Sequence, residues 1–403
     1  MHKKTLKFGI LLSTSGSYGA VGQSMRAGAQ LAIEEVNADR AAPVTLDPVE
    51  LDPGGVGSAY AEAVQSLLVD HGLTHVFGLY TSSSRKDVLN QFEKNDALLW
   101  YPSHYEGFET SDNVIYTGAA PNQHIIPLAR HLLARHGNRG WFVGSNYIWA
   151  WENNRILREA LMDAGGAVMG ERYFPVGETD FGALVDQILR DRPDFVFNTL
   201  IGDSGYEFFR LLRAAAEAIG IDQSRVMPVA SCSLSEAELP LIGDAAAGHL
   251  SSSVYFSTIR SPENDRFTAR WDDRFAHLGR ACADAEASYV AVHLLARAVA
   301  KAGDFGLAQV REAARGLHFA APQGLVTLDP DNLHCCMRPR IGRSTANGTF
   351  ELLHEDPWPV RPDPYLVWDT VAAAATAQGP ASGAATETAS GAASGARHLM
   401  VVR

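Results

Sequence analysis

Short apolar runs alternate with segments of helical periodicity over the first 120 residues. Residues 24–37, for example, repeat apolar side chains at the three- and four-residue spacing of a helix with one buried face. The strands predicted in this way are 6–12, 44–51, 76–79 and 97–101, and the helices are 24–37, 60–70 and 85–95. This alternation predicts a parallel sheet with helices on both faces.

The same alternation starts again near residue 140. Strands are predicted at 140–144, 167–174 and 194–200, and helices at 152–164, 181–190 and 206–218. Helices at 266–275 and 283–302 follow, and residues 324–353 have the pattern of strands separated by turns. The predicted fold class is therefore α/β, with two doubly wound parallel-sheet lobes.

The loops that follow the predicted strands share one kind of chemistry. They are rich in Ser, Thr, Tyr and Trp and poor in charge, and they span 13–18, 80–84, 101–105, 145–149, 202–205 and 231–235. Ligands of open α/β sheets bind outside the carboxyl ends of the strands. Hydroxyl groups beside aromatic rings suit a small, polar and largely neutral ligand. Ser and Gly are also ordinary loop residues, so the prediction depends on the recurrence of this chemistry in six loops.

Charge and cysteine content exclude several classes of protein. The 403 residues carry 34 Lys and Arg against 46 Asp and Glu, a net charge of -12, which disfavours direct binding of a nucleic-acid backbone. The four cysteines lack CxxC spacing and are expected to be free thiols in a reducing compartment. His334-Cys335-Cys336 has no second half-site, so no metal or other cofactor is predicted.

The two ends of the chain carry little structural signal. The apolar run 8–12 is shorter than the hydrophobic region of a signal peptide, and no stretch is long enough to span a membrane, so a cytoplasmic location without membrane contact is expected. Residues 371–403 are rich in Ala, Gly and Ser and are expected to form a disordered tail.

Motifs that could indicate catalysis are incomplete. Gly202-Asp203-Ser204 resembles a lipase motif but has no Asp-x-x-His after it, and Ser82 has no matched base, so no enzyme activity is predicted. His131 and His136 are five residues apart, which does not suit a metal site on one helix face. Arg85-Lys86 is interpreted as a solvated helix face or, alternatively, a partner contact.

Several blocks of the chain together carry a family resemblance, which extends from about residue 6 to 369. They are 78–86, 100–109, 120–123, 144–149, 321–324 and 361–365. These blocks resemble the type I periplasmic-binding-protein fold and, within it, the amide-sensing regulators of aliphatic amidase expression. The Tyr101-Pro-x-x-Tyr-Glu-Gly107 block is shared with binding components of urea and short-chain-amide importers.

The resemblance implies two lobes joined by a three-strand hinge. Lobe 1 would comprise 1–119 and 257–322, and lobe 2 would comprise 120–256 and 323–370, with the chain crossing near residues 119, 257 and 322. A small ligand would bind in the cleft between the lobes and stabilise their closed arrangement.

The resemblance also implies the ligand-binding residues. The expected set is Tyr80, Ser82, Tyr101, Pro102, Ser103, Tyr147 and Trp149, to which Asp203 and Ser233 are added from the neighbouring loops. Ser82 and Ser103 would hydrogen-bond an amide, and aromatic rings would surround its alkyl end. The amide sensors have Thr in place of Ser103 and Tyr in place of Trp149, so the preferred amide is left open. Because the expected wall lacks an acidic residue, apart from Asp203 or a Glu near Ser235, a neutral ligand is expected.

Three functions are compatible with this sequence. The first is a cytoplasmic amide sensor that controls an RNA-binding antitermination regulator by lobe closure, either alone or as a homo-oligomer. The second is the solute-binding component of an importer for urea or short-chain amides. The third, an enzyme that acts on amides, lacks a matched catalytic base.

Overall fold

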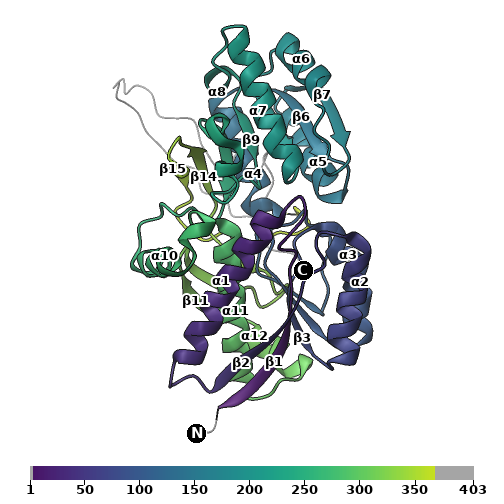
Figure 1. Cartoon of the computed structure of the whole chain (residues 1–403), viewed down its shortest axis with the longest axis vertical. Helices are drawn as coiled ribbons and strands as arrows, with labels where there is room; N and C mark the ends of the chain where they lie inside the picture. The colour runs from purple at the N-terminus through teal and green to yellow at the C-terminus, as the bar shows by residue number, and fades with distance from the viewer. Residues whose placement is uncertain (1–2, 368–403) are drawn as a thin grey trace, which may run out of the picture.

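Two α/β lobes lie one above the other in the computed structural model, which describes residues 3–367 (Figure 1). Lobe 1, the lower one, contains a five-stranded parallel sheet with the order β2-β1-β3-β4-β5. The strands are β1 (Lys4–Leu11), β2 (Val44–Leu51), β3 (His75–Gly78), β4 (Leu98–Tyr101) and β5 (Val114–Tyr116).

Helices cover both faces of the lobe 1 sheet. One face packs against α1 (Gly19–Ala38), α11 (Ala283–Ala302) and α12 (Leu307–Ala314), and the other against α2 (Gly57–Gln65) and α3 (Ser82–Lys94) (Figure 1). The helices α1 and α11 approach closely, because a Cβ on Gly28 would come within 2.0 Å of the carbonyl oxygen of Ala285. Residues 283–302 therefore belong to lobe 1, although they follow most of lobe 2 in the sequence. Helix α10 (Pro262–Phe275) also lies on this lobe.

Lobe 2 contains a seven-stranded sheet with the order β15-β14-β10-β9-β8-β6-β7. Its strands are β6 (Arg139–Ser145), β7 (Ala167–Phe174), β8 (Phe195–Thr199), β9 (Val229–Ser231), β10 (Leu250–Ser253), β14 (Arg340–Ser344) and β15 (Phe350–Glu355). The first five strands pair in parallel, and the β14–β15 hairpin adds antiparallel to β10. The helices are α4 (Ile125–Arg135), α5 (Ile148–Asp163), α6 (Gly182–Asp191), α7 (Asp203–Ala218), α8 (Gln223–Val226) and α9 (Leu239–Ile242).

Three connections join the lobes. The first two lie between β5 and α4 and between β10 and α10, close to the expected crossings near 119 and 257. The small antiparallel sheet of β11 (His318–Ala321), β12 (Gly324–Leu328) and β13 (Cys335–Cys336) packs on the core of lobe 1. The third crossing therefore follows β13 instead of lying near residue 322, because Val326, Leu328 and Cys335 are buried in the lobe 1 core.

The predicted α/β class with two parallel-sheet lobes is confirmed. The bounds of β2, β7 and α11 match the predicted segments, whereas the predicted helix 60–70 divides into α2 and a π-helical turn, Ser66–Asp70. Helix α4 is anticipated only in placing His131 and His136 on a helix, without predicted bounds. No helix within residues 3–367 is both long and apolar enough to cross a membrane. The predicted tail, 371–403, lies outside the described residues.

Candidate functional site

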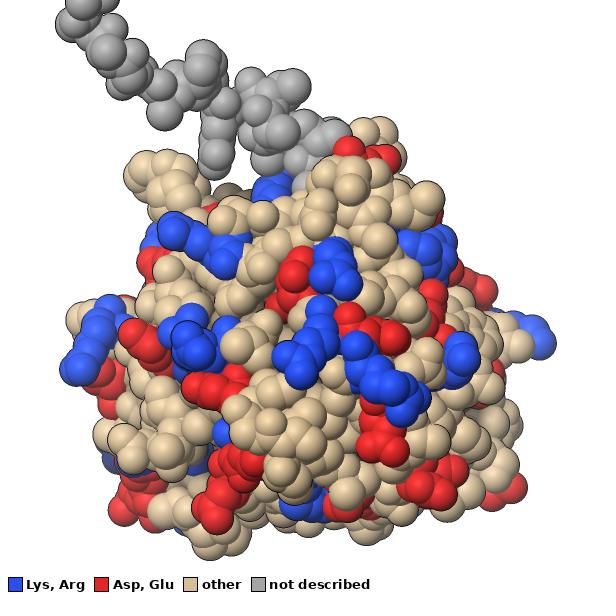
Figure 2. Space-filling view, turned by 90° about the horizontal axis from the view of Figure 1, so that it is seen from above, with Lys and Arg blue, Asp and Glu red and all other residues tan. Residues whose placement is uncertain are grey.

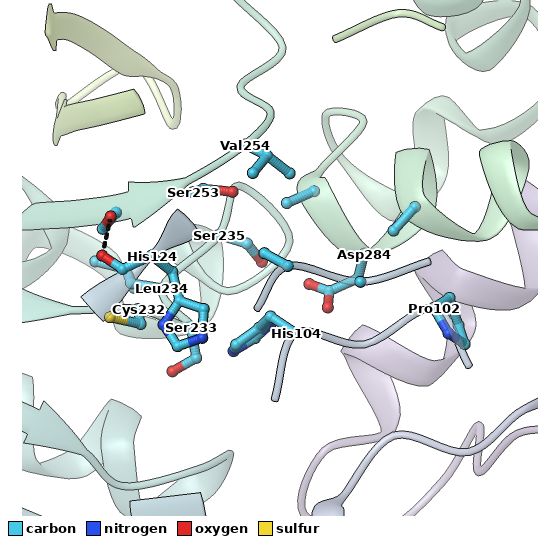
Figure 3. A pocket seen from close by; sticks show the side chains of 15 residues that line it. Pro102, His104, His124, Cys232, Ser233, Leu234, Ser235, Ser253, Val254 and Asp284 are labelled. Carbon is cyan, nitrogen blue, oxygen red and sulfur yellow. Dashed lines mark hydrogen bonds between the residues drawn. The ribbon is translucent and has the colours of Figure 1, made fainter. Parts of the chain in front are cut away.

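Two small cavities lie between the lobes. The larger cavity, about 30 Å³, is enclosed by the loops after β4 and β9, by β10 and by the first turn of α11 (Figure 3). The smaller cavity, about 10 Å³, is lined by Tyr80, Ser82, His104, Tyr147, Trp149, Ile201 and Ser233. Because His104 and Ser233 line both cavities, the two form adjacent parts of one site.

The site lies where the sheet topology predicts a ligand. Its residues follow β3 and β4 of lobe 1 and β6, β8 and β9 of lobe 2, at the carboxyl ends of parallel strands. The loop that follows β3 leads directly into α3, whose first turn is capped by the Thr81 side chain accepting from the backbone N–H of Ser84. This cap fixes the direction of the chain at Tyr80 and Ser82.

The cleft is closed in this structure. A Cβ on Gly202 of lobe 2 would lie only 2.0 Å from the carbonyl oxygen of Ser17 in lobe 1. At the other side of the cleft, the guanidinium of Arg155 in α5 lies 4.9 Å from the ring centre of Phe108 in lobe 1. Among the described residues, the two small cavities lie beside these contacts.

Aromatic rings surround the smaller cavity. The Trp149 ring lies 5.4 Å from the His104 ring in an edge-to-face arrangement and 6.3 Å from the Tyr147 ring in a stacked one. Trp149 is 3% exposed, and its indole Nε1–H has no acceptor among the described residues. An unpaired buried donor costs about 1–3 kcal/mol, so this N–H is available to a ligand oxygen.

The hydroxyl of Ser82 is held by a buried ion network behind the cavity. Ser82 donates to the carboxylate of Glu106, and Arg85 Nη1 lies 3.4 Å from Ser82 Oγ. Arg85 also pairs with Glu106 at 3.0 Å and with Glu109 at 2.7 Å, and Lys86 pairs with Glu109 at 2.7 Å. Since Ser82 donates internally, its oxygen can only accept a hydrogen bond from a ligand.

The interpretation of Arg85 as part of a solvated helix face is wrong. Arg85 is fully buried, whereas the Lys86 side chain is 34% exposed. Although burial alone would lower the pKa of Arg85, the neighbouring Tyr101, Glu106 and Glu109 raise it well above its ordinary value. The network therefore keeps the guanidinium charged, and its role is to support the loops that carry Ser82 and Tyr101.

The larger cavity presents hydrogen-bond acceptors. His124 Nε2 lies 2.9 Å from the carbonyl oxygen of Tyr105, so it carries the proton, and Nδ1 is left as an acceptor without a partner among the described residues. Burial lowers the pKa of His124 to about 4, and burial together with His124 lowers that of His104 to about 3, so both rings are neutral. Figure 3 shows the carboxyl group of Asp284 extending toward the same space from the side of α11.

Buried acids near this cavity have raised pKa values. Burial raises the pKa of Asp284 to about 7, a shift that its own backbone N–H and the Ser235 hydroxyl oppose. Burial and the charge of Asp284 raise the pKa of Glu238 to about 8, and burial raises that of Glu236 to about 7. None of these three carboxyls forms an ion pair within residues 3–367. An acid therefore does line the cleft, at Asp284, a residue that the expected wall did not include.

The structure brings together part of the predicted site. Tyr80, Ser82, Tyr147 and Trp149 line the smaller cavity, Pro102 lines the larger one, and Ser233 lines both. The remaining three line neither cavity: Tyr101, Ser103 and Asp203.

Three predicted residues have other positions. Tyr101 is fully buried and donates from its hydroxyl to the Tyr80 carbonyl oxygen at 2.9 Å, and Ser103 donates to the Leu79 carbonyl oxygen at 3.2 Å. Both residues therefore support the loop after β3 from behind. Asp203 is exposed in the first turn of α7.

The sequence did not single out three residues of the larger cavity: His104, His124 and Asp284. His104 lies inside the Tyr-Pro-x-x-Tyr-Glu-Gly block, which was a usable signal. Asp284 opens a helix that follows most of lobe 2 in the sequence, and periodicity does not show that this turn faces the cleft. No group of three or more potential metal ligands occurs within residues 3–367.

Two lobes that close over a small site between them define a class of binding protein, and the comparisons identify the family. The model of the family described as periplasmic binding protein domain matches residues 6–370. The chain belongs to this family, and its fold is the type I periplasmic-binding-protein fold.

Curated relatives and solved structures agree with this assignment. The chain is 24% identical over 334 residues to Leu/Ile/Val-binding protein homolog 6 of Brucella abortus, covering 82% of this chain and 85% of the relative. It is 27% identical over 339 residues to the leucine-, isoleucine-, valine-, threonine- and alanine-binding protein of Pseudomonas aeruginosa, covering 82% and 87%.

Two solved structures share the fold. One is the solute binding protein of an ABC transporter from Rhodopseudomonas palustris HaA2 in complex with p-hydroxybenzoic acid. It has a TM-score of 0.81 and 20% identity, covering 90% of this chain and 99% of that one. The other is a leucine binding protein from Thermotoga maritima, with a TM-score of 0.76 and 17% identity, covering 87% and 99%.

Proposed function

We propose that this protein is a solute-binding protein that closes its lobes around urea or a short-chain aliphatic amide. The family relationship and the closed cleft support binding of a small solute. The small volume of the cleft is the observation that favours urea or a short-chain amide over larger solutes. Cavities of about 30 and 10 Å³ hold only about two to four water-sized groups, because one such group needs about 10–15 Å³.

Hydrogen-bond chemistry supports the same class of ligand. Ser82 Oγ, His124 Nδ1 and, when ionised, the Asp284 carboxylate accept hydrogen bonds. Trp149 Nε1–H donates. A ligand with several N–H groups and one carbonyl oxygen complements this set. A neutral amide fits this set when the Asp284 carboxylate accepts a hydrogen bond from the amide nitrogen. The proposed ligand is therefore still neutral, although an acid lines the cleft.

The role in the cell has two candidates. The similarity to an amino-acid-binding protein and to a solute binding protein of an ABC transporter supports a solute-binding component of an ABC-type importer. The residues that resemble those of the amide sensors favour the second role, because Tyr80, Ser82 and Tyr147 converge on one cavity. In that role, the protein would hold an RNA-binding antitermination regulator in the cytoplasm and release it when an amide closes the cleft. In both roles it binds its ligand without turnover.

Calorimetry tests the ligand. Urea, acetamide, propionamide and butyramide are titrated into the full chain, with leucine and 4-hydroxybenzoate as larger comparison solutes. We expect saturable 1:1 heat with at least one of the four small solutes and weaker or no heat with the larger two. The absence of heat and of a thermal shift with all four small solutes contradicts the proposed ligand class.

A second experiment separates the two roles. An antitermination regulator encoded beside this gene is co-expressed with the protein, and the complex is isolated with and without the amide that gave heat. The sensor role predicts a complex that the amide dissociates. Association with membrane permease subunits, and no complex with the regulator, supports the importer role. Hydrolysis of any of the amides by the purified protein contradicts both.

A further inference from the structure

A groove on lobe 2 gathers basic side chains from three elements. It lies between the C-terminal half of α4 and the β14–β15 hairpin, and its volume is about 670 Å³, which is within the range of small-molecule sites. Six basic or imidazole side chains line it: Arg130, His131, Arg135, His136, Arg343 and His354. This concentration contrasts with the net charge of -12 and with the interspersed blue and red side chains on the upper face of the molecule (Figure 2).

Within residues 3–367, a single carboxylate lines this groove. Asp356 is the one carboxylate among its lining residues, and it already lies 2.7 Å from Nε2 of His354. Glu351 is opposite Arg343 in the β14–β15 register, but the two do not form an ion pair. Within residues 3–367, neither Arg135 nor Arg343 has a carboxylate oxygen within 4.0 Å. The guanidinium groups of Arg135 and Arg343 therefore face this groove without an ion-pair partner among residues 3–367.

A helix dipole explains only part of this arrangement. Arg135 and His136 stand at the C-terminal end of α4, where positive charge is favourable. Arg343 and His354 come from a hairpin about 200 residues later in the chain, so tertiary packing brings them to the same groove. That packing brings like charges close together, and the stability of α4 alone does not explain why they are there.

The titration of the imidazoles reports this repulsion. Burial, followed by the positive groups at His136, His354, Arg135 and Arg343, lowers the pKa of His131 to about 4. Burial and Arg343 also lower the pKa of His136. These side chains line one groove, so their mutual repulsion acts across a common space. An anion in that space would oppose the lowering and allow the rings to take up protons.

We propose that this groove is a second binding site, separate from the cleft, for an oxyanion that carries two or more negative charges. The planar forks of Arg135 and Arg343 suit carboxylate or phosphate oxygens, and the three imidazoles add donors when protonated. The oxyanion is carried either by a free small molecule or by an acidic segment of a partner protein. This inference goes beyond the proposed function, since it does not depend on which solute fills the cleft.

Calorimetry and histidine NMR test the groove in the full chain. Inorganic phosphate, citrate and a ten-residue glutamate peptide are titrated at low salt at about pH 6.5 and about pH 8. We expect 1:1 binding of at least one probe, tighter at the lower pH, with a rise in the pKa of His131. Citrate or phosphate binding as tightly as the peptide identifies a free small anion. Peptide binding about tenfold tighter than citrate identifies an acidic partner segment.

Matched variants locate the binding. Arg135→Gln with Arg343→Gln is expected to weaken binding about tenfold, since two exposed ion pairs are lost. Arg190→Gln, an exposed arginine of α6 in the same lobe, is the control and should leave binding unchanged. Amide binding in the cleft should be the same in all three proteins. No binding of any probe to the wild-type protein, or equal binding by the double variant, overturns the proposal.

Discussion

Gly202 of lobe 2 lies against the backbone of Ser17 of lobe 1, and this contact requires the absence of a side chain. A Cβ added to Gly202 would be 2.0 Å from the Ser17 carbonyl oxygen, and the φ angle of 59° is also one that other residues rarely adopt. The contact lies at the carboxyl ends of β1 and β8, beside the cleft. Gly202 therefore limits how far the two lobes can approach.

Gly202→Ala is expected to hinder closure. Because the ligand stabilises the closed arrangement, the affinity for the solute should fall about tenfold or more, measured by calorimetry. Small-angle scattering should show a larger radius of gyration in the presence of ligand than for the wild type. Gly220→Ala is the matched control, since Gly220 has a φ of 73° but no atom within 4 Å of the added Cβ. If both variants lose affinity equally, backbone strain and not interlobe contact is responsible.

Trp149→Phe should weaken ligand binding with little loss of stability. The variant loses apolar volume, which destabilises the protein, but it also removes a buried N–H that has no acceptor in the described protein, which stabilises it. Because the two effects partly cancel, the free energy of unfolding should change by about 1 kcal/mol or less. The affinity for an amide should fall about tenfold, because the ligand oxygen loses its donor.

Trp141→Phe is the contrasting variant. Trp141 Nε1 donates to Asp191 at 3.0 Å within lobe 2, so this change should destabilise the fold by about 2 kcal/mol in urea unfolding. Ligand affinity should not change. If Trp149→Phe binds the amide as tightly as the wild type, the indole N–H does not contact the ligand.

The buried carboxyls should make the ligand-free protein less stable as the pH rises from about 6.5 to 8.5. Asp284, Glu236 and Glu238 have folded-state pKa values of about 7 to 8, above those of the unfolded chain. The folded protein therefore binds more protons than the unfolded one in this range, and the free energy of unfolding falls as pH rises. Buried histidines such as His124 act in the opposite sense, but only below about pH 6.5.

Asp284→Asn tests this assignment. The variant should reduce the loss of unfolding free energy between about pH 6.5 and 8.5 by about 1–2 kcal/mol, measured by urea titration at each pH. Because the charge of Asp284 raises the pKa of Glu238, the two titrate as a coupled set, and the remaining loss should move to lower pH in the variant. A wild-type stability that is flat or increases over this range contradicts raised pKa values in the cleft.

Arg85→Met should destabilise the protein strongly. It leaves Glu106 and Glu109 buried without the guanidinium that pairs with both, which typically costs about 3–5 kcal/mol. Lys86→Met is the control, since this partly exposed lysine contributes about 1 kcal/mol or less. Urea unfolding of both variants measures the difference. Equal effects of the two substitutions would mean that the buried network is not a major source of stability.

The arrangement of layers could be predicted from the sequence because it depends on local periodicity. The predicted bounds of β2, β7 and α11 agree with the structure, and α11 has buried apolar positions along most of its length. The third crossing could not be placed in this way. Its position depends on whether β12 packs on lobe 1 or lobe 2, and an apolar strand fits either core.

Only those residues of the candidate site that lie in loops after predicted strands could be predicted from the sequence. The rule for carboxyl ends of strands, together with the family resemblance, selected Tyr80, Ser82 and Trp149, which line the smaller cavity. The direction of a hydroxyl proton is a tertiary property, so Ser103 was expected to contact ligand although it donates to Leu79. Asp284 reaches the cleft only because α11 packs against α1, and no local pattern carries that information.

The interleaving of the lobes has a consequence for protein synthesis. Ser251 of β10 pairs with Gly342 of β14, and α1 packs against α11 more than 240 residues later in the chain. An emerging polypeptide therefore cannot complete the first lobe until α11 has left the ribosome, and the second lobe needs the hairpin that follows it. Both cores therefore depend on contacts between distant parts of the chain, which slows folding and leaves apolar strands exposed to aggregation during synthesis.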